Sequence, residues 1–193
     1  MTATPDVAHV SIGVRVAGSA AQAVLAAANE RASSLIEALR AAGLTEADLA
    51  TSGVSLYPQY PSSGNSAEVY EANNTLTVTV RDIERSGEII DLAASVAGEH
   101  VAIHSISFGV TDPEAAIGPA RVAAIANARA RAAEYATAAG VTVGDLVAIT
   151  ENSFGGGPAP FVREARVASA GGVPLETGTT VLTAAVTVVF EIA

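Results

Sequence analysis

The chain has 193 residues, of which half are hydrophobic, and it has no cysteine and a formal net charge of −10. The apolar content is sufficient for an ordinary core, and the absence of cysteine excludes disulfides, thiolate catalysis and cysteine–zinc sites. All ten basic residues are arginine, against twenty acidic residues, which excludes lysine Schiff bases and disfavours a nucleic-acid partner. No apolar run approaches the roughly 18 to 20 residues that cross a bilayer, so no transmembrane segment is expected.

The first hundred residues predict strands and helices in the order β-α-β-β-α. Apolar side chains first recur at every second position, from Val10 to Val16, which is the period of a half-buried strand. They then recur at helical spacing, after a capping box at residues 19–22 and as far as Gly43. The predicted elements are a strand over 10–16, a helix from 19 to 43, strands over 49–60 and about 76–80, and a helix over about 83–97 that Asp82 caps.

Two of the three histidines, His100 and His104, lie four residues apart in a predicted strand. The apolar positions change parity between residues 103 and 106, which predicts a β-bulge near His104. On a strand these histidines would lie about 13 Å apart, too far to bind one ion together. Glu99 would point away from His100, which disfavours a carboxylate–histidine relay. We therefore expect histidines on a solvated or interface face, and no catalytic, metal or cofactor site.

A long helix is predicted after Asp112, which can act as N-cap because Pro113 suits the first helical position. The helix should extend to Ala139, before Gly140, with a kink or a delayed regular part at residues 118–119. The remaining predicted strands lie at about 143–152 and 179–192.

Two features of the second half could indicate a phosphate site, but neither has the full pattern. Arg121, Arg129 and Arg131 lie on the long helix, and a solvated face is the favoured interpretation because no Gly-rich turn accompanies them. Residues 155–158 are Gly-Gly-Gly-Pro, without the spacing, the lysine or the following helix of a phosphate loop.

The candidate interaction residues come from two regions. Residues 153–178 are predicted to form a mobile loop, whose apolar residues could dock on a neighbouring subunit. Three tyrosines near the second and third strands could contact a small ligand or peptide, or could simply cover a sheet edge. The candidates are Tyr57, Tyr60, Tyr70, Phe161, Val162 and Arg163.

We expect an α+β protein: a two-layer α/β sandwich in which a ferredoxin-like β-α-β-β-α-β order is followed by α-β-β. The interval from Gly43 to Asp48 repeats from Gly140 to Asp145, which suggests an internal β-α-β-β duplication. The expected organisation is a single domain over 1–193, with sub-layers 7–111 and 112–192.

Short motifs occur along nearly the whole chain: Asp48-Leu49-Ala50-Thr51, residues 56–60, residues 70–82, Ile106-Ser107-Phe108-Gly109 and the alanine-rich helix with Arg121. In their order and spacing they resemble the SIMPL-domain family. The resemblance implies a location in the periplasm or cell envelope, because members are usually exported. Relatives typically have an export signal and an earlier strand before the equivalent of Pro5, so the resemblance implies that this chain is truncated at its N-terminus.

The resemblance also implies assembly, since one member forms a ring-like, channel-shaped oligomer, and another member is linked to oxidative-stress tolerance. It supplies no catalytic residues and no cofactor. The expected function is that of a noncatalytic, self-assembling envelope protein with a scaffolding or stress-related role. The alternatives are a small-ligand or peptide binding module and, third, a hydrolase that uses Glu99 with His100 or His104. A homo-oligomer is the expected arrangement, with an envelope protein or a peptide as a further partner.

Overall fold

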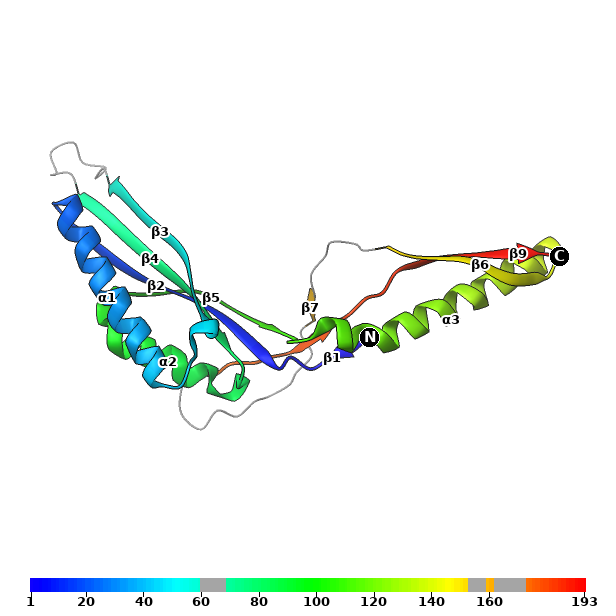
Figure 1. The fold of residues 1–193 in the computed structure, drawn as a ribbon, viewed down its shortest axis with the longest axis horizontal. Coiled ribbons are helices and arrows are strands. Elements are labelled where there is room, and N and C mark those ends of the chain that lie inside the picture. The colour runs from blue at the N-terminus through cyan, green and yellow to red at the C-terminus, as the bar shows by residue number, and fades with distance from the viewer. Residues whose placement is uncertain (60–68, 153–158, 162–172) are drawn as a thin grey trace. The chain divides into compact units, whose positions relative to one another are not determined.

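A computed structural model describes residues 1–59, 69–152, 159–161 and 173–193, the short stretch 159–161 by its backbone alone (Figure 1). Contacts divide the chain into two compact units. We call residues 6–109 with 165–177 the sandwich unit, and residues 1–5, 110–164 and 178–193 the α3 unit. The chain passes between the units after Pro5, after Gly109, after Glu164 and after Thr177.

The sandwich unit is built on a four-stranded antiparallel sheet with the strand order β3-β4-β2-β5. Side chains alternate between the two faces of each strand, and Val10, Ile12 and Val14 are fully buried on one face. Each such side chain stabilises the fold by about 1.5 to 3 kcal/mol. The elements are β2 (Val7–Gly18), α1 (Ala21–Ala41), β3 (Leu49–Gln59), β4 (Val69–Val80), α2 (Ser86–Ala97) and β5 (Val101–Gly109).

Helices α1 and α2 cover the buried face of this sheet (Figure 1). The buried residues of α1 recur every three or four positions from Val24 to Leu39, which is the helical spacing that the sequence predicts. The expected capping box at residues 19–22 is wrong. Because β2 continues to Gly18 and α1 begins at Ala21, Ala20 is the N-cap and it makes no side-chain cap bond.

The α3 unit contains one long helix and two small sheets. The predicted caps of the helix are confirmed: the Ala115 N–H donates to the Asp112 carboxylate at 2.9 Å, and Gly140 ends the helix with a φ of 72°. The helix runs through Pro119 without a delayed start. The elements are α3 (Pro113–Ala139), the antiparallel pair β6 (Val143–Glu151) and β9 (Val186–Ile192), and the sheet β1 (Thr2–Ala3), β8 (Thr179–Val181) and β7 (Ala159–Phe161) in the order β1-β8-β7.

The predicted final strand over 179–192 is two strands. Residues 179–181 pair with β1 and β7, whereas residues 186–192 pair with β6, so the chain leaves one sheet and enters another. The α+β class is confirmed by these helices and antiparallel sheets. No helix within the described ranges is both long and apolar enough to cross a membrane.

Candidate interaction surfaces

Helix α3 packs on the two-stranded sheet of β6 and β9 through small side chains. A stripe of alanines recurs every four residues along the sheltered side of α3, yet only Ala120 and Ala136 in this helix are buried. The guanidinium of Arg129 lies 5.9 Å from the centre of the Phe190 ring on β9, within the range of a cation–π contact. The alanine stripe consists of Ala120, Ala124, Ala128, Ala132 and Ala136.

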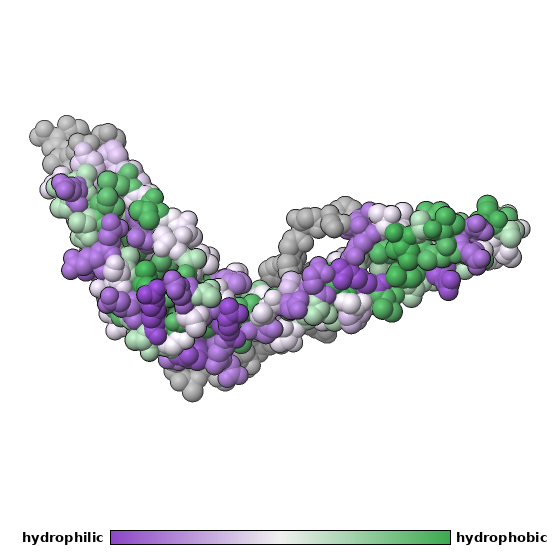
Figure 2. Space-filling model, in the orientation of Figure 1, coloured by the Kyte–Doolittle hydropathy of each residue, from purple (hydrophilic) through white to green (hydrophobic). Residues whose placement is uncertain are grey.

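Large apolar side chains are exposed on helix α3 and on strands β6 and β9. On α3, Val122 is 70% exposed and Tyr135 is 77% exposed, and on β9 Ile192 is 72% exposed. Figure 2 shows hydrophobic residues gathered over β6 and β9. Exposed apolar clusters of this kind mark interaction sites in folded proteins. We call them the α3-unit apolar residues: Val122, Ile125, Tyr135, Leu146, Val147, Ile149, Val189 and Ile192.

Arg121 of α3 is paired with two carboxylates of the same unit. Arg121 Nε donates to both carboxylate oxygens of Glu151, at 2.9 and 3.0 Å, and a terminal nitrogen donates to Glu114 at 2.9 Å. The hydrogen bond to Glu151, followed by that to Glu114, raises the pKa of Arg121. Two carboxylates therefore neutralise Arg121. This pairing favours a solvated helix face at Arg121 and disfavours a phosphate site.

The second surface is the outer strand β3 of the sandwich unit. Its sequence from Leu49 to Gln59 contains no charged residue, and every residue after Leu49 is exposed. Val54 is 57% exposed and Leu56 is 39% exposed. Both project to the face that carries the core, since they lie opposite Asn74 and the buried Ala72 of β4.

The candidate tyrosines do not share a face. The Tyr57 hydroxyl donates to Glu71 Oε1 at 2.8 Å, and this hydrogen bond raises the pKa of Tyr57. Tyr70 neighbours Glu71 on the strand and packs, partly buried, against the core on the other face of the sheet. Tyr60 lies outside the described residues. The tyrosines in the described ranges therefore do not form one concave surface.

Of the three candidate interaction residues in the predicted loop, the structure describes Phe161 by its backbone. Phe161 ends β7, where its backbone pairs with Thr179. Val162 and Arg163 lie outside the described residues, as does most of the predicted loop over 153–178.

His104 and His100 lie beside neighbouring positions of β2, at Gly13 and Arg15. The β-bulge near His104 is confirmed, because the register of β2 and β5 shifts where Ser11 pairs with Ser105 and Ile12 with Ile103. The His104 ring lies over Gly13, where an added Cβ would be only 2.5 Å from Nε2. A glycine at this strand position therefore makes room for the imidazole.

The prediction that Glu99 points away from His100 is wrong. Both residues belong to a 3₁₀ turn, Gly98–His100, that precedes β5, so the alternation of a strand does not apply. Glu99 Oε1 lies 3.8 Å from His100 Nε2, and His100 Nδ1 lies 3.1 Å from the carbonyl oxygen of Arg15. Glu99 is 90% exposed, so solvent screens this pair. Within the described residues no three His, Cys, Asp or Glu side chains are arranged to hold a metal ion.

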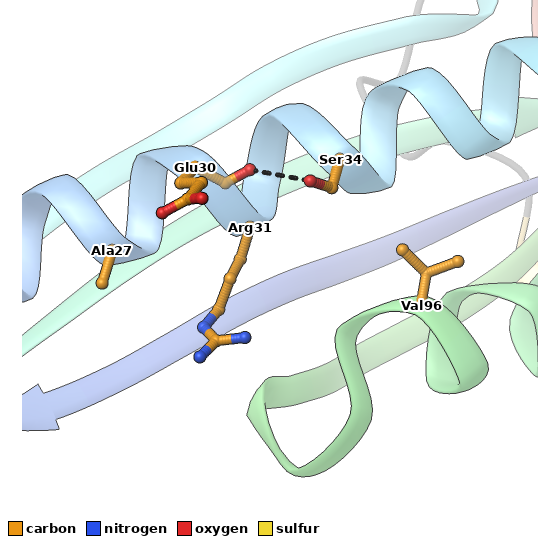
Figure 3. A pocket seen from close by; sticks show the side chains of 5 residues that line it. All are labelled: Ala27, Glu30, Arg31, Ser34 and Val96. Atoms are coloured by element: carbon orange, nitrogen blue, oxygen red, sulfur yellow. Dashed lines mark hydrogen bonds between the residues drawn. The ribbon is translucent and has the colours of Figure 1, made fainter.

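A shallow depression of about 190 Å³ lies between α1 and α2 (Figure 3). Ala27, Glu30, Arg31 and Ser34 of α1 line it together with Val96 of α2. The Ser34 hydroxyl donates to the Glu30 carbonyl within α1, at 3.2 Å. Ligand pockets usually enclose about 300 to 1,000 Å³, so this open depression is a weak candidate for a ligand site.

Comparison with known proteins identifies the family of the chain. The family model SIMPL, described as a protein of unknown function (DUF541), matches residues 1–190. The 26 kDa periplasmic immunogenic protein of Brucella melitensis is 32% identical over 204 residues, which cover 100% of this chain and 81% of that protein, and the same figures hold for Brucella abortus. The uncharacterized protein YggE of Escherichia coli K12 is 30% identical over 163 residues, covering 83% of this chain and 65% of YggE. The chain therefore belongs to the SIMPL family, as its sequence motifs predicted.

Proposed function

We propose that the protein is a noncatalytic, self-assembling scaffold of the cell envelope, in which the α3 units of neighbouring copies pack together. The observation that carries the proposal is the exposure of α3. In this helix of 27 residues only Ala120 and Ala136 are buried, while Val122 and Tyr135 are largely exposed. A helix of this length would ordinarily bury a continuous apolar stripe.

The chemistry of the surface also supports packing against another copy. Alanine covers much of α3, and small side chains permit close approach of a second helix or sheet. The exposed tyrosine and the aliphatic residues of β6 and β9 are of the kind enriched at the cores of protein interfaces. Burying one large apolar side chain contributes roughly 1.5 to 3 kcal/mol, so several together can offset the entropy cost of association.

Two further points complete the proposal. The matched Brucella proteins are named periplasmic, which supports an extracytoplasmic location for this chain. The strand order β3-β4-β2-β5, with α1 and α2 on one face, supports the ferredoxin-like reading of residues 7–111.

Light scattering during gel filtration at micromolar concentration tests the proposal. The wild-type protein should elute as an oligomer, and Val122→Asp or Tyr135→Asp should shift it to smaller species, because each would bury a carboxylate in an apolar contact. Val96→Asp is the matched control, since Val96 is also an exposed helical residue but lies on α2 of the sandwich unit. A wild-type protein that is monomeric at every concentration would refute the proposal.

A further inference from the structure

We propose that the β3 strands of two copies pair antiparallel about a two-fold axis at Ser55, which would join two four-stranded sheets into one. The inference rests on the proposed function only in that both require self-association. It concerns a different surface, in the sandwich unit, and a defined register of contact. Five observations on β3 support it.

The first two observations concern the edge itself. Among the described strands, β3 pairs with β4 alone, so its outer hydrogen-bonding edge has no strand partner. Natural edge strands are usually protected by charged side chains, prolines or bulges. On β3 there is no charge, and the irregular positions lie at its two ends, a register shift between Thr51 and Gly53 and a proline at Pro58. The stretch over residues 53–57 is regular and unprotected.

The third observation is an incomplete apolar layer on the helix side of β3. Helix α1 packs mainly on β2 and β4, and it contacts β3 only slightly. Val54 and Leu56 project to this side and are 57% and 39% exposed. With the axis at Ser55, Val54 pairs with the partner's Leu56, and Leu56 with the partner's Val54. The contact would thus continue the apolar layer from one copy into the next.

The fourth observation concerns the opposite face, where Tyr57 and Gly53 lie two residues to either side of the axis. An added Cβ on Gly53 would meet no atom within 4 Å, so there is open space above it. In the proposed register Tyr57 lies opposite the partner's Gly53, and an aromatic ring over a cross-strand glycine stabilises sheet edges. An axis at Val54 would place Leu56 opposite the partner's Ser52, and an axis at Leu56 would place Val54 opposite the partner's Pro58. Among these three, the axis at Ser55 is the one that places both Val54 and Leu56 opposite a valine or leucine of the partner.

The fifth observation is electrostatic. The chain has a formal net charge of −10, so most contacts between two copies would oppose acidic groups. Pairing through β3 places no charged side chain of one strand against the other, because residues 49–59 carry none. Contact through β3 therefore opposes no like-charged side chains on the two paired strands.

The absence of cysteine permits a direct test by single-cysteine crosslinking. Residues directly opposite in an antiparallel pair have Cα atoms about 4.5 to 5.5 Å apart, within the range of a disulfide. Ser55→Cys should therefore form a disulfide-linked dimer under mild oxidation. Ser52→Cys is the matched control, because its two copies would lie roughly 20 Å apart along the paired strands and should remain unlinked.

A second variant keeps the test independent of cysteine chemistry. Val54→Lys would place a charge against the partner's Leu56, and it should weaken dimerisation in ultracentrifugation by about tenfold or more. Val96→Lys is the control on the same unit and should leave the dissociation constant unchanged. Circular dichroism of both variants verifies that the unit is folded.

The crosslink is also measured in the Val122→Asp background, which separates this inference from the proposed function. A Ser55→Cys dimer that persists there supports β3 pairing as a contact independent of the α3-unit apolar residues. If the wild type assembles but Ser55→Cys and Ser52→Cys crosslink equally or not at all, the β3 pairing is wrong and the proposed function stands. If no variant crosslinks and the wild type is monomeric, both are wrong, and an extended peptide becomes the better occupant of the edge.

Discussion

Asp48 is the one buried charged side chain within the described residues, and its contacts are local. Its Oδ2 accepts hydrogen bonds from the backbone N–H and the hydroxyl of Thr45, at 3.0 and 2.6 Å, and its Oδ1 accepts one from Arg81 Nε at 2.9 Å. These hydrogen bonds lower the pKa of the Asp48 carboxyl, and those from Thr45 have the largest effect. The carboxylate fixes the turn between α1 and β3, from which the edge strand starts.

The lowered pKa predicts a pH dependence of stability for Asp48. A carboxyl whose pKa is lower in the folded state stabilises the fold above its unfolded pKa, 3.8, and loses this contribution as pH falls through the folded value. Asp48→Asn should therefore reduce the free energy of unfolding by about 1 to 3 kcal/mol at pH 7. The difference from wild type should shrink below about pH 4. Urea unfolding across this range measures it.

Glu46→Gln is the control for this prediction, because Glu46 lies on the exposed side of the same turn. It should leave the free energy of unfolding nearly unchanged at every pH. A difference between Asp48→Asn and wild type that stays constant down to pH 2 would show that the effect is not one of charge.

At the scale of elements, Pro119 inside α3 is the clearest conflict between local sequence and structure. A proline removes one helical hydrogen bond and its ring meets the carbonyl four residues before it, at Ala115. Pro119→Ala should raise the free energy of unfolding by about 1 to 3 kcal/mol. Pro113→Ala is the control with little effect, because Pro113 occupies the first helical position, where no N–H is needed. Denaturant unfolding of both variants tests this, and equal effects would contradict it.

The elements that the sequence predicted are those whose signals are local and repeated. The parity change around His104 predicted the bulge, and the pair Asp112 and Gly140 predicted both ends of α3. The 3₁₀ turn at residues 98–100 was missed because one short turn has no period, and the strand period was extended over it. The two strands within 179–192 were merged because alternation does not report which partner a strand pairs with. The ferredoxin-like topology and the internal duplication stay predictions.

At the scale of the whole molecule, the candidate surfaces were the least predictable feature. Val122 and Ile125 have the i, i+3 spacing of ordinary core contacts. The same spacing occurs in a helix that packs within its own chain and in one that packs against another chain. Likewise, the alternation of Leu56 and Val54 indicates a strand but not that it lies at an edge. Exposure depends on contacts between distant segments, which one sequence does not reveal. The absence of charge from β3 was the one signal that could have identified the edge as unprotected.

Self-assembly through apolar residues predicts that thermal stability depends on protein concentration. Binding that occurs only in the folded state stabilises it, by about 2.7 kcal/mol when the partner is at 100 times its dissociation constant. The Tm of the wild type should therefore rise between about 1 and 100 μM protein, whereas that of Val122→Asp should rise much less.

The effect of salt on this concentration dependence distinguishes assembly through apolar contacts from assembly through charge–charge attraction. With a net charge of −10, copies repel one another, and added salt screens that repulsion without weakening apolar contacts. The concentration dependence of Tm should therefore persist or increase in about 0.5 M NaCl. Differential scanning calorimetry at two concentrations and two salt levels measures both effects. A Tm that is independent of concentration in wild type, or a dependence that salt abolishes, would contradict assembly through the α3-unit apolar residues.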